Sequence, residues 1–383
     1  MLVLVMYGLL LFGVFMIESA ARHLAVSKEI AEQFGGPGPY YAGMQKKWIA
    51  LGSVVYFAAA FVDYRWIRWL AVPFYGVSLG LMGMAAMADD KVHRLVLGGV
   101  SFQPAQMGVA AGIIMIAWLL QDLPRLHRWL GLPIVKIAII GVTSAIPFLM
   151  VMKMGDMGSA LVWIPVIIVA LVIGGVPFRH LMFMFLMAAA ILPILNFIVL
   201  PMVSDRGPER IDVWLRMTRG LEVDISDEGY APHNISMAVG KAGWKGVGWK
   251  AEGSLHAKAF IPKDTAHNDY IFAVIAEELG FRGSLLLISA FVLLMIQGLF
   301  IAFYARDLSG RVLACLIVAL FFAHVFESMG MCVLLMPITG IPLPLVSYSG
   351  TFVIICMMLL GMVQSVWIHR NVRSHSALET GNE

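Results

Sequence analysis

Ten apolar segments follow one another along this chain, and each is long enough to cross a lipid bilayer. A helix needs about 20 apolar residues to span the hydrocarbon core, where its backbone groups must be hydrogen bonded within the segment. Hydrophobic residues make up 60% of the chain and charged residues only 13%, whereas soluble domains are about 25% charged. The sequence therefore predicts an all-α polytopic membrane protein that forms a single membrane domain over residues 1–383. The expected spans are residues 1–19, 47–64, 69–88, 104–120, 133–151, 157–175, 181–201, 282–304, 311–336 and 346–368.

The distribution of Lys and Arg predicts how these spans are oriented. Cytoplasmic loops of membrane proteins carry an excess of both residues. We therefore expect both termini in the cytoplasm and the large loop between the seventh and eighth spans, residues 202–268, outside. The net charge of +3 gives no reason to expect nucleic acid as a partner. The basic residues that set the orientation fall in alternate loops and at the C-terminus, at Arg65, Arg68, Arg125, Arg128, Arg179, Arg306, Arg311, Arg370 and Arg373.

The large loop contains a stretch rich in Gly, Lys and Trp, G-K-A-G-W-K-G-V-G-W-K at Gly240–Lys250. Backbone amides of such a stretch, together with the ammonium groups of Lys241 and Lys245, can surround anionic oxygens. The alternative is a solvated loop whose lysines touch lipid headgroups. We expect no secondary structure in this loop, and a loop of this length without any is uncommon unless it is functional. This favours an anion-binding role.

Asp269 stands where the polar loop ends and the next helix begins. A carboxylate at such a boundary can meet a substrate that has a polar head and a lipid tail. Glycosidases generally need two carboxylates, but one suffices when the leaving group is a pyrophosphate, which departs without a proton and needs cations to carry its charge. This favours glycosyl transfer from a lipid pyrophosphate, with Asp269 as the base for the acceptor hydroxyl. The alternative is that Asp269 merely caps the helix that follows.

Several motifs resemble those of one family. H-N-D-Y-I-F-A-V-I-A-E-E-L-G at His267–Gly280 is similar to H-T-D-F-I-F-A-V-L-A-E-E-L-G of the SEDS (shape, elongation, division and sporulation) family. P-I-T-G-I-P-L-P-L-V-S-Y-S-G at Pro337–Gly350 is similar to its P-V-T-G-I-P-L-P-F-x-S-Y-G-G. Weaker matches are F-Q-P at 102–104 and G-D-M-G-S-A at 155–160. Since the similarity covers nearly the whole chain and is closest to the RodA branch, the chain is identified as a divergent member of this family.

The resemblance implies a ten-helix fold and a specific reaction. SEDS proteins resemble one another in polymerising lipid II into peptidoglycan strands at the outer face of the bacterial cytoplasmic membrane, and the RodA branch does so in cell elongation and shape. Asp269 matches the family's essential aspartate, which is taken to deprotonate the acceptor sugar hydroxyl while undecaprenyl pyrophosphate leaves. The resemblance further implies a class B penicillin-binding protein as crosslinking partner, contact with membrane lipid, and help from a divalent cation, Mg²⁺ or Mn²⁺. The sequence itself shows no metal-ligand constellation.

The motifs also suggest which residues bind substrate, and here the chain departs from the family pattern. Gln106 and Val109 stand where the family has Glu and Lys, so one cation expected in the donor site is missing. Positive charge is instead expected from Arg94 and from the lysines of the large loop. The candidate substrate-binding residues are Arg94, Gln103, Lys241, Lys245, His267, Glu277 and Ser347.

Some polar residues have simpler interpretations that stay open. Glu278 lies four residues before Arg282 and could form a helical ion pair with it. Asp156 could cap the helix that follows it. His324 and Glu327 fall inside the ninth span, where a polar side chain must face a cavity or a polar partner.

Two other function classes stay open as well. A polar cavity between helices would suit a lipid II transporter (a flippase), for which an intramembrane charge such as Glu327 would be essential and Asp269 dispensable. The second alternative is a catalytically silent scaffold for the penicillin-binding protein, and Val109 in place of the family lysine favours it.

Overall fold

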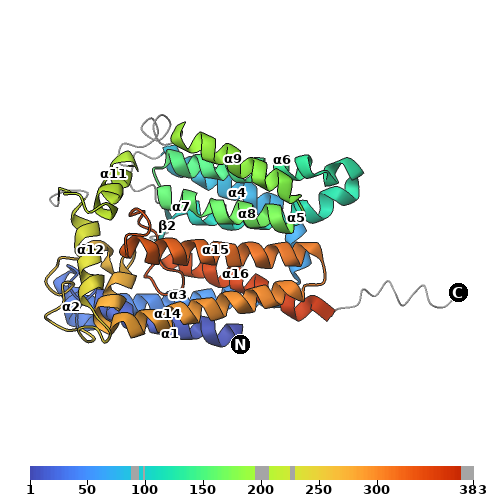
Figure 1. Ribbon diagram of the computed structural model, residues 1–383. Helices are drawn as coiled ribbons and strands as arrows, with labels where there is room; N and C mark the ends of the chain where they lie inside the picture. The colour runs from blue at the N-terminus through green and yellow to red at the C-terminus, as the bar shows by residue number, and fades with distance from the viewer. Residues whose placement is uncertain (88–94, 98–99, 195–206, 225–228, 372–383) are drawn as a thin grey trace.

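A computed structural model of the chain describes residues 1–87, 95–97, 100–194, 207–224 and 229–371. These residues form a bundle of long helices that run side by side, with shorter helices gathered at one end (Figure 1). Each of the ten predicted spans corresponds to a helix or, for the sixth, to two consecutive helices. They are α1 (Leu2–Ala20), α3 (Pro37–Phe61), α4 (Ile67–Met87), α5 (Pro104–Leu126), α6 (Pro133–Lys153), α7 (Met157–Leu161) with α8 (Trp163–Ile173), α9 (Phe178–Ile194), α14 (Ile271–Phe303), α15 (Leu308–Cys332) and α16 (Gly350–Ile368).

Within the described residues, seven helices are long and apolar enough to cross a membrane, namely α1, α4, α5, α6, α14, α15 and α16. Two further apolar helical stretches are shorter, Met157–Ile173 and Phe178–Met187. The prediction of an all-α membrane fold is confirmed. The exception is one short antiparallel hairpin before α5, in which β1 (Leu95–Leu97) pairs with β2 (Val100–Phe102).

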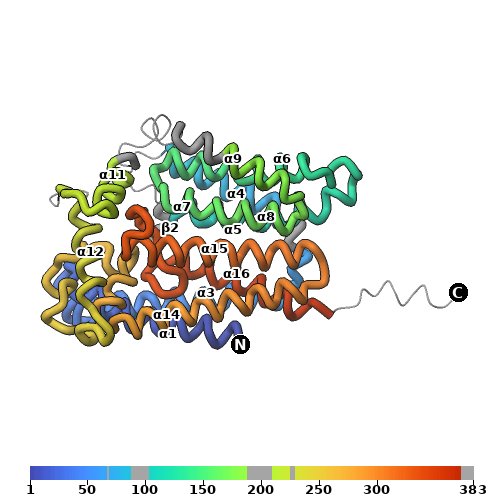
Figure 2. The backbone as a smooth tube through the Cα atoms, viewed as in Figure 1, coloured from blue at the N-terminus to red at the C-terminus, as the bar shows by residue number. Residues whose placement is uncertain are grey.

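The expectation that the large loop has no secondary structure is wrong. Its described part contains α11 (Gly207–Thr218), α12 (Tyr230–Lys241) and α13 (Lys263–Ala266). α11 begins with Gly-Pro-Glu, and both a proline in the first turn and an acidic residue beside it favour a helix start. These helices lie at the same end of the bundle as α2 (Lys28–Phe34), as the tube in Figure 2 shows.

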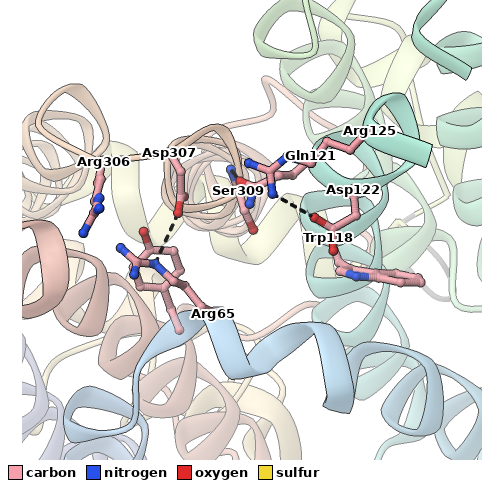
Figure 3. A pocket seen from close by; sticks show the side chains of 9 residues that line it. Arg65, Trp118, Gln121, Asp122, Arg125, Arg306, Asp307 and Ser309 are labelled. Atoms are coloured by element: carbon pink, nitrogen blue, oxygen red, sulfur yellow. Dashed lines mark hydrogen bonds and ion pairs between the residues drawn. The ribbon is translucent and has the colours of Figure 1, made fainter. Parts of the chain in front are cut away.

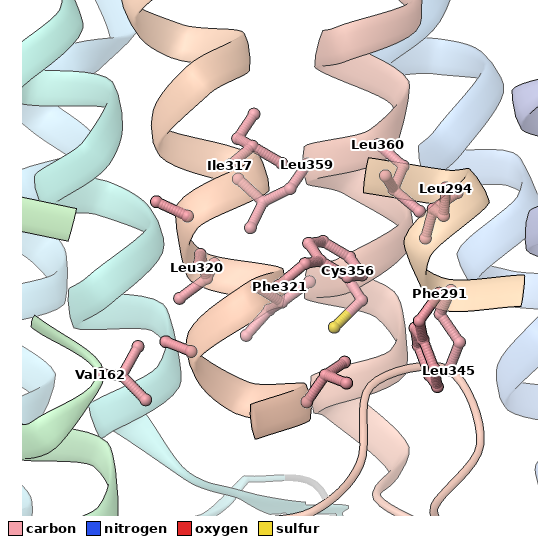
Figure 4. Packing of buried hydrophobic residues seen from close by; sticks show 14 of the residues in the cluster. Val162, Phe291, Leu294, Ile317, Leu320, Phe321, Leu345, Cys356, Leu359 and Leu360 are labelled. Atoms are coloured by element: carbon pink, nitrogen blue, oxygen red, sulfur yellow. The ribbon is translucent and has the colours of Figure 1, made fainter. Parts of the chain in front are cut away.

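α15 is the central helix, and side chains along nearly its whole length are buried. It packs against α5 and α8 on one side and against α14 and α16 on the other, while α3 runs along α16. Figure 4 shows Ile317, Leu320 and Phe321 of α15 among Leu359 and Leu360 of α16. Since lipid tails are as apolar as these side chains, close packing has to hold the helices together.

Small residues permit that packing between α3 and α16. A Cβ added at Gly52 would lie 2.5 Å from the Sδ atom of Met357, and one added at Gly361 would lie 2.5 Å from the carbonyl oxygen of Tyr56. A larger residue at Gly361 would meet backbone and force the helices apart, whereas one at Gly52 would first displace the flexible side chain of Met357.

The two ends of the bundle carry different groups. The N-terminus and the last turn of α16 lie at one end, and the helices of the large loop lie at the other (Figure 1). The turns at the terminal end carry Arg65, Arg125, Arg306 and Arg370. This placement agrees with the predicted alternation of basic loops. That these turns face the cytoplasm stays a prediction.

Candidate active site

Asp269 lies in a tight turn between α13 and α14. The backbone N–H groups of Asp269 and Tyr270 both donate to the carbonyl of Thr265, at 2.9 and 3.2 Å. Tyr270 occupies the N-cap position of α14, and its side chain makes no cap hydrogen bond. Asp269 lies one position before the N-cap, so it is not the N-cap residue that the alternative requires. Its side chain is half-buried at the loop end of the bundle, as a carboxylate that meets a substrate must be.

A second loop, residues 333–349 between α15 and α16, holds this turn in place. The Ser347 hydroxyl donates to the carbonyl of Asn268 at 2.6 Å and accepts the N–H of Leu343 at 2.8 Å. The N–H of Tyr348 donates to the carbonyl of His267 at 3.0 Å. Ser347 is completely buried. The predicted contact of Ser347 with substrate is therefore corrected. Its hydroxyl instead positions the backbone beside Asp269.

Gly340 of the same loop lies directly beside the Asp269 carboxylate. Its φ is +76°, and a Cβ added there would lie 3.4 Å from Asp269 Oδ2. Residues with a side chain rarely adopt such a φ. The glycine in T-G-I-P thus has a structural reason, because it lets the loop pass close to the carboxylate.

His267 packs inside the site and does not line it. It is 7% exposed, and its ring lies 4.9 Å from the ring of Tyr41 and 5.4 Å from that of Tyr348, centre to centre. Burial lowers the pKa of His267 to about 4. The ring is therefore neutral near pH 7 and supports the turn by packing, so the structure gives no support to a direct contact with substrate.

The Gly/Lys/Trp stretch is arranged differently from the prediction. The N–H of Val247 donates to the carbonyl of Glu277 at 2.9 Å, and that of Gly248 to the carbonyl of Glu278 at 3.0 Å. These amides therefore bind backbone carbonyls of α14 instead of surrounding an anion. Lys241 and Lys245 are exposed on the large loop, where they can meet an anionic group.

The close contact between the backbone of the Gly/Lys/Trp stretch and that of α14 requires a glycine in each of the two segments. α14 is interrupted at Gly280, which has φ +68° and ψ −165°. A Cβ at Gly280 would collide with the backbone of Lys245 and Gly246, and one at Gly246 would collide with the carbonyl of Glu278. Because the break removes the helical spacing between Glu278 and Arg282, the predicted ion pair between these two residues has no geometric basis.

Glu277 and Glu278 instead hold neighbouring segments. The Glu277 carboxylate accepts the backbone N–H groups of Leu255 and His256. The Glu278 carboxylate accepts the hydroxyl of Ser19 in α1 at 2.5 Å. Both glutamates are buried. The predicted role of Glu277 in binding substrate is thus corrected, since its two oxygens already bind the backbone.

Gln103 belongs to a chain of polar groups that runs into the bundle. Its amide donates to Asp156 at 2.8 Å, and Asp156 also accepts the N–H and the hydroxyl of Ser159 at 3.0 and 2.7 Å, which makes it the predicted cap of α7. Gln106 donates to Ser159 at 3.1 Å and contacts His324 Nε2 at 3.1 Å. His324 therefore has a polar partner within the bundle, as a membrane-embedded histidine requires.

Two other residues, Val109 and Arg94, are expected to determine the positive charge of the donor site. Val109, which stands in place of the family lysine, is buried in the apolar core. Arg94 lies outside the described residues.

A small cavity beside Tyr270 was not predicted from the sequence. Its volume is about 60 Å³, and it is lined by residues of α11, α12 and the 333–349 loop, including Arg210, Trp214 and Pro232. The indole N–H of Trp214 donates to the carbonyl of Leu334 at 2.8 Å and fixes α11 to that loop. A helix at 207–218 could have been inferred from its Gly-Pro-Glu start, but its position against Leu334 depends on a contact across 120 residues.

The described residues contain no group of three or more His, Cys, Asp or Glu side chains that could hold a metal ion. Among the described residues around Asp269, therefore, no set of side chains fits a metal ion held by protein ligands.

Comparison with known proteins gives consistent matches. The family model for FtsW, RodA and SpoVE, described as "Cell cycle protein", matches residues 1–372. The peptidoglycan glycosyltransferase MrdB of Escherichia coli K12 is 31% identical over 334 residues, which are 86% of each chain. The probable peptidoglycan glycosyltransferase FtsW of Geobacter sulfurreducens is 30% identical over 374 residues, which cover 95% of this chain and 94% of the relative.

Solved structures agree with these matches in fold. A chain from a study of polymerization and crosslinking by a peptidoglycan synthase complex has a TM-score of 0.76 at 24% identity and covers 97% of this chain and 98% of its own. The rod shape determining protein RodA of Thermus thermophilus has a TM-score of 0.66 at 23% identity, with 97% of both chains covered. The resemblance seen in the sequence motifs is thereby confirmed.

Proposed function

This chain belongs to the family of FtsW, RodA and SpoVE, and on that premise we propose that it is a peptidoglycan glycosyltransferase that polymerises lipid II in cell elongation and shape. The observation that carries this proposal is the position of Asp269. Two loops distant in sequence hold it, half-buried, at the end of the helix bundle where the large loop lies. MrdB and FtsW, the relatives named above, are peptidoglycan glycosyltransferases by name.

The reaction would use Asp269 as a general base. Its carboxylate accepts the proton of the acceptor's sugar hydroxyl, and the hydroxyl oxygen forms a bond to the anomeric carbon of the donor. The bond between that carbon and the pyrophosphate oxygen breaks, and undecaprenyl pyrophosphate leaves with the electron pair. No second acid is needed, because the pyrophosphate departs unprotonated and requires only positive charge around it.

Cations for the leaving group are available on the large loop. Lys241 and Lys245 are exposed there, and Arg210 lines the cavity next to Tyr270. Arg94 keeps its proposed role as a pyrophosphate partner from the sequence motif alone. A divalent cation, Mg²⁺ or Mn²⁺, would have to be held mainly by the substrate's own phosphates, since the described residues offer no ligand group for it.

The membership of the family also suggests the cellular location and the partner of the protein. We place the protein in the bacterial cytoplasmic membrane, with both termini in the cytoplasm and the large loop outside, where lipid II presents its sugars. A class B penicillin-binding protein is the proposed crosslinking partner. The similarity of this fold to a chain studied for the coordination of polymerization and crosslinking supports that choice.

The test is strand synthesis from fluorescent lipid II by the purified, reconstituted chain. General base catalysis contributes about 10²- to 10⁴-fold, so Asp269→Asn is expected to lower the rate of strand formation at least about 100-fold. Asp264→Asn is the matched control, since Asp264 is an exposed carboxylate in α13, five residues before Asp269. It should keep wild-type activity.

Two results would contradict the proposal and indicate a different function. Translocation of lipid II without strand product, unaffected by Asp269→Asn, would identify a transporter. Capture of the penicillin-binding protein by a chain with neither activity would identify a scaffold.

A further inference from the structure

A second cavity lies far from Asp269, at the end of the bundle that holds the termini (Figure 1). Its volume is about 300 Å³, which is the lower limit for small-molecule sites. It is bounded by the turn between α3 and α4, the C-terminal part of α5 and the turn between α14 and α15 (Figure 3). The lining residues are Tyr64, Arg65, Trp118, Gln121, Asp122, Arg125, Arg306, Asp307 and Ser309.

The charges around this cavity do not balance. Three arginines line it, against two carboxylates. Arg65 Nε lies 3.4 Å from Asp307, and Arg125 Nη1 lies 3.5 Å from Asp122. Arg306 is exposed and has no ion pair with any residue that the structure describes. One positive charge is therefore left over at the edge of an open cavity.

The hydrogen-bond donors around the cavity are only partly paired with acceptors of the protein. Arg65 Nη2 is buried and has no hydrogen-bond acceptor among the described residues. Because this nitrogen is closed off from the cavity, the donors that a ligand can reach are those of the exposed Arg306 and Arg125. Gln121 accepts the backbone N–H of Ser309 at 2.5 Å with its oxygen, which directs its NH₂ group to other acceptors. Guanidinium groups in such a cluster match the geometry of phosphate oxygens.

The surroundings favour a ligand that belongs to the membrane surface. Trp66 follows Arg65, Leu126 follows Arg125, and Phe303 ends the helix just before Arg306; these apolar side chains are 62%, 75% and 77% exposed. In a membrane protein such residues face acyl chains, and Trp is enriched at the level of the headgroups. The basic cavity is thus placed where a phosphate attached to a lipid would lie.

We propose that this cavity binds a phosphate group, carried by an anionic phospholipid or by a soluble phosphate compound. Arg306 and Arg125 contact the phosphate oxygens, and Arg65 adds its positive charge in the cavity wall. Such a ligand would join the α3–α4 turn, α5 and the α14–α15 turn at this end of the bundle. The inference does not depend on the reaction proposed for Asp269.

The experiment measures binding of short-chain phosphatidylglycerol, short-chain phosphatidylcholine and inorganic phosphate to the purified full-length chain. The variants are Arg306→Gln and Arg125→Gln, with Arg128→Gln as the control, because Arg128 is exposed at the same end but does not line the cavity. A hydrogen bond to a charged group is worth about tenfold in affinity or more. We therefore expect Arg306→Gln to raise the Kd for phosphatidylglycerol about tenfold, while Arg128→Gln leaves it unchanged. Asp122→Asn, which removes a negative charge, should tighten binding.

The outcomes separate the sources of phosphate. Binding of phosphatidylglycerol alone would assign the site to a lipid headgroup, and binding of inorganic phosphate as well would show that the phosphate group suffices; both support the proposal. Equal binding of phosphatidylcholine and phosphatidylglycerol, or equal effects of Arg306→Gln and Arg128→Gln, would overturn it. Melting temperatures of the ligand-free variants identify any that fail to fold, and Arg306→Gln breaks no described contact.

Discussion

The two ends of α14 are held in contrasting ways. At its start, the turn with Asp269 and the break at Gly280 are fixed mostly by hydrogen bonds between backbone groups of distant loops. At its other end, the turn into α15 is surrounded by charged side chains, among them Arg65 and Asp307. Backbone contacts fix atoms within a few tenths of an ångström, whereas ion pairs between partly exposed side chains are weaker and more adaptable. The first kind suits a carboxylate that must be placed where a hydroxyl arrives, and the second suits a ligand held by charge.

The largest expected effect concerns the backbone contact at Gly280. Gly280→Ala should destabilise the fold by about 4 kcal/mol, because the φ/ψ pair there is nearly restricted to glycine and the added Cβ meets the 245–246 backbone. The melting temperature and the yield of monodisperse protein check this. Gly240→Ala is the control, since a Cβ at Gly240 would have nothing within 4 Å. Equal stability of the two variants would show that the loop is not seated on α14 as described.

The next largest effect is a dependence of the folding stability on pH, which arises near the start of α14. Burial lowers the pKa of His267 from 6.5 to about 4, so the unfolded chain takes up this proton at a higher pH than the folded one. The stability that the neutral ring contributes is complete above about pH 6.5 and is lost as the pH falls toward 4, by about 3 kcal/mol in all. Melting curves between pH 7 and pH 4 should show this slope, and His267→Gln should flatten it. A slope unchanged in the variant would contradict the burial.

A smaller effect is expected at Gly340. Gly340→Ala places a methyl group 3.4 Å from Asp269 Oδ2 at a φ of +76°, which costs about 2 kcal/mol in strain. If the loop shifts to relieve it, the carboxylate moves, and strand synthesis should fall about tenfold or more. Gly253→Ala in the large loop, where a Cβ would meet nothing within 4 Å, is the control. Full activity of Gly340→Ala would argue against tight positioning.

The smallest effect compares two neighbouring serines. Ser347 makes hydrogen bonds to Leu343 and Asn268, whereas the buried hydroxyl of Ser349 has no partner among the described residues. Ser347→Ala should therefore cost about 1 kcal/mol of stability and reduce strand synthesis severalfold, while Ser349→Ala should cost nothing. Similar losses from both substitutions would remove the positioning role of Ser347.

The sequence predicted the long helices well and the contacts of the site poorly, for physical reasons. Lipid forces each apolar segment to satisfy its own backbone, so the ten helical segments follow from local composition. Asp269 is predicted as the base because it marks a boundary between a polar and an apolar region, and that role stays a prediction. The contact between Ser347 and Asn268 spans 79 residues, and no local pattern encodes it. The glycines of the 240–250 stretch were assigned to an anion because their partner, the break at Gly280, only becomes apparent in three dimensions.

The most direct test of the role of Asp269 is to measure turnover and lipid II affinity on the same Asp269→Asn protein. A general base acts on the transition state, so the account predicts that strand synthesis falls at least about 100-fold while the Kd for lipid II stays within about twofold of wild type. If turnover is retained, or if affinity falls as far as turnover does, Asp269 is not the base.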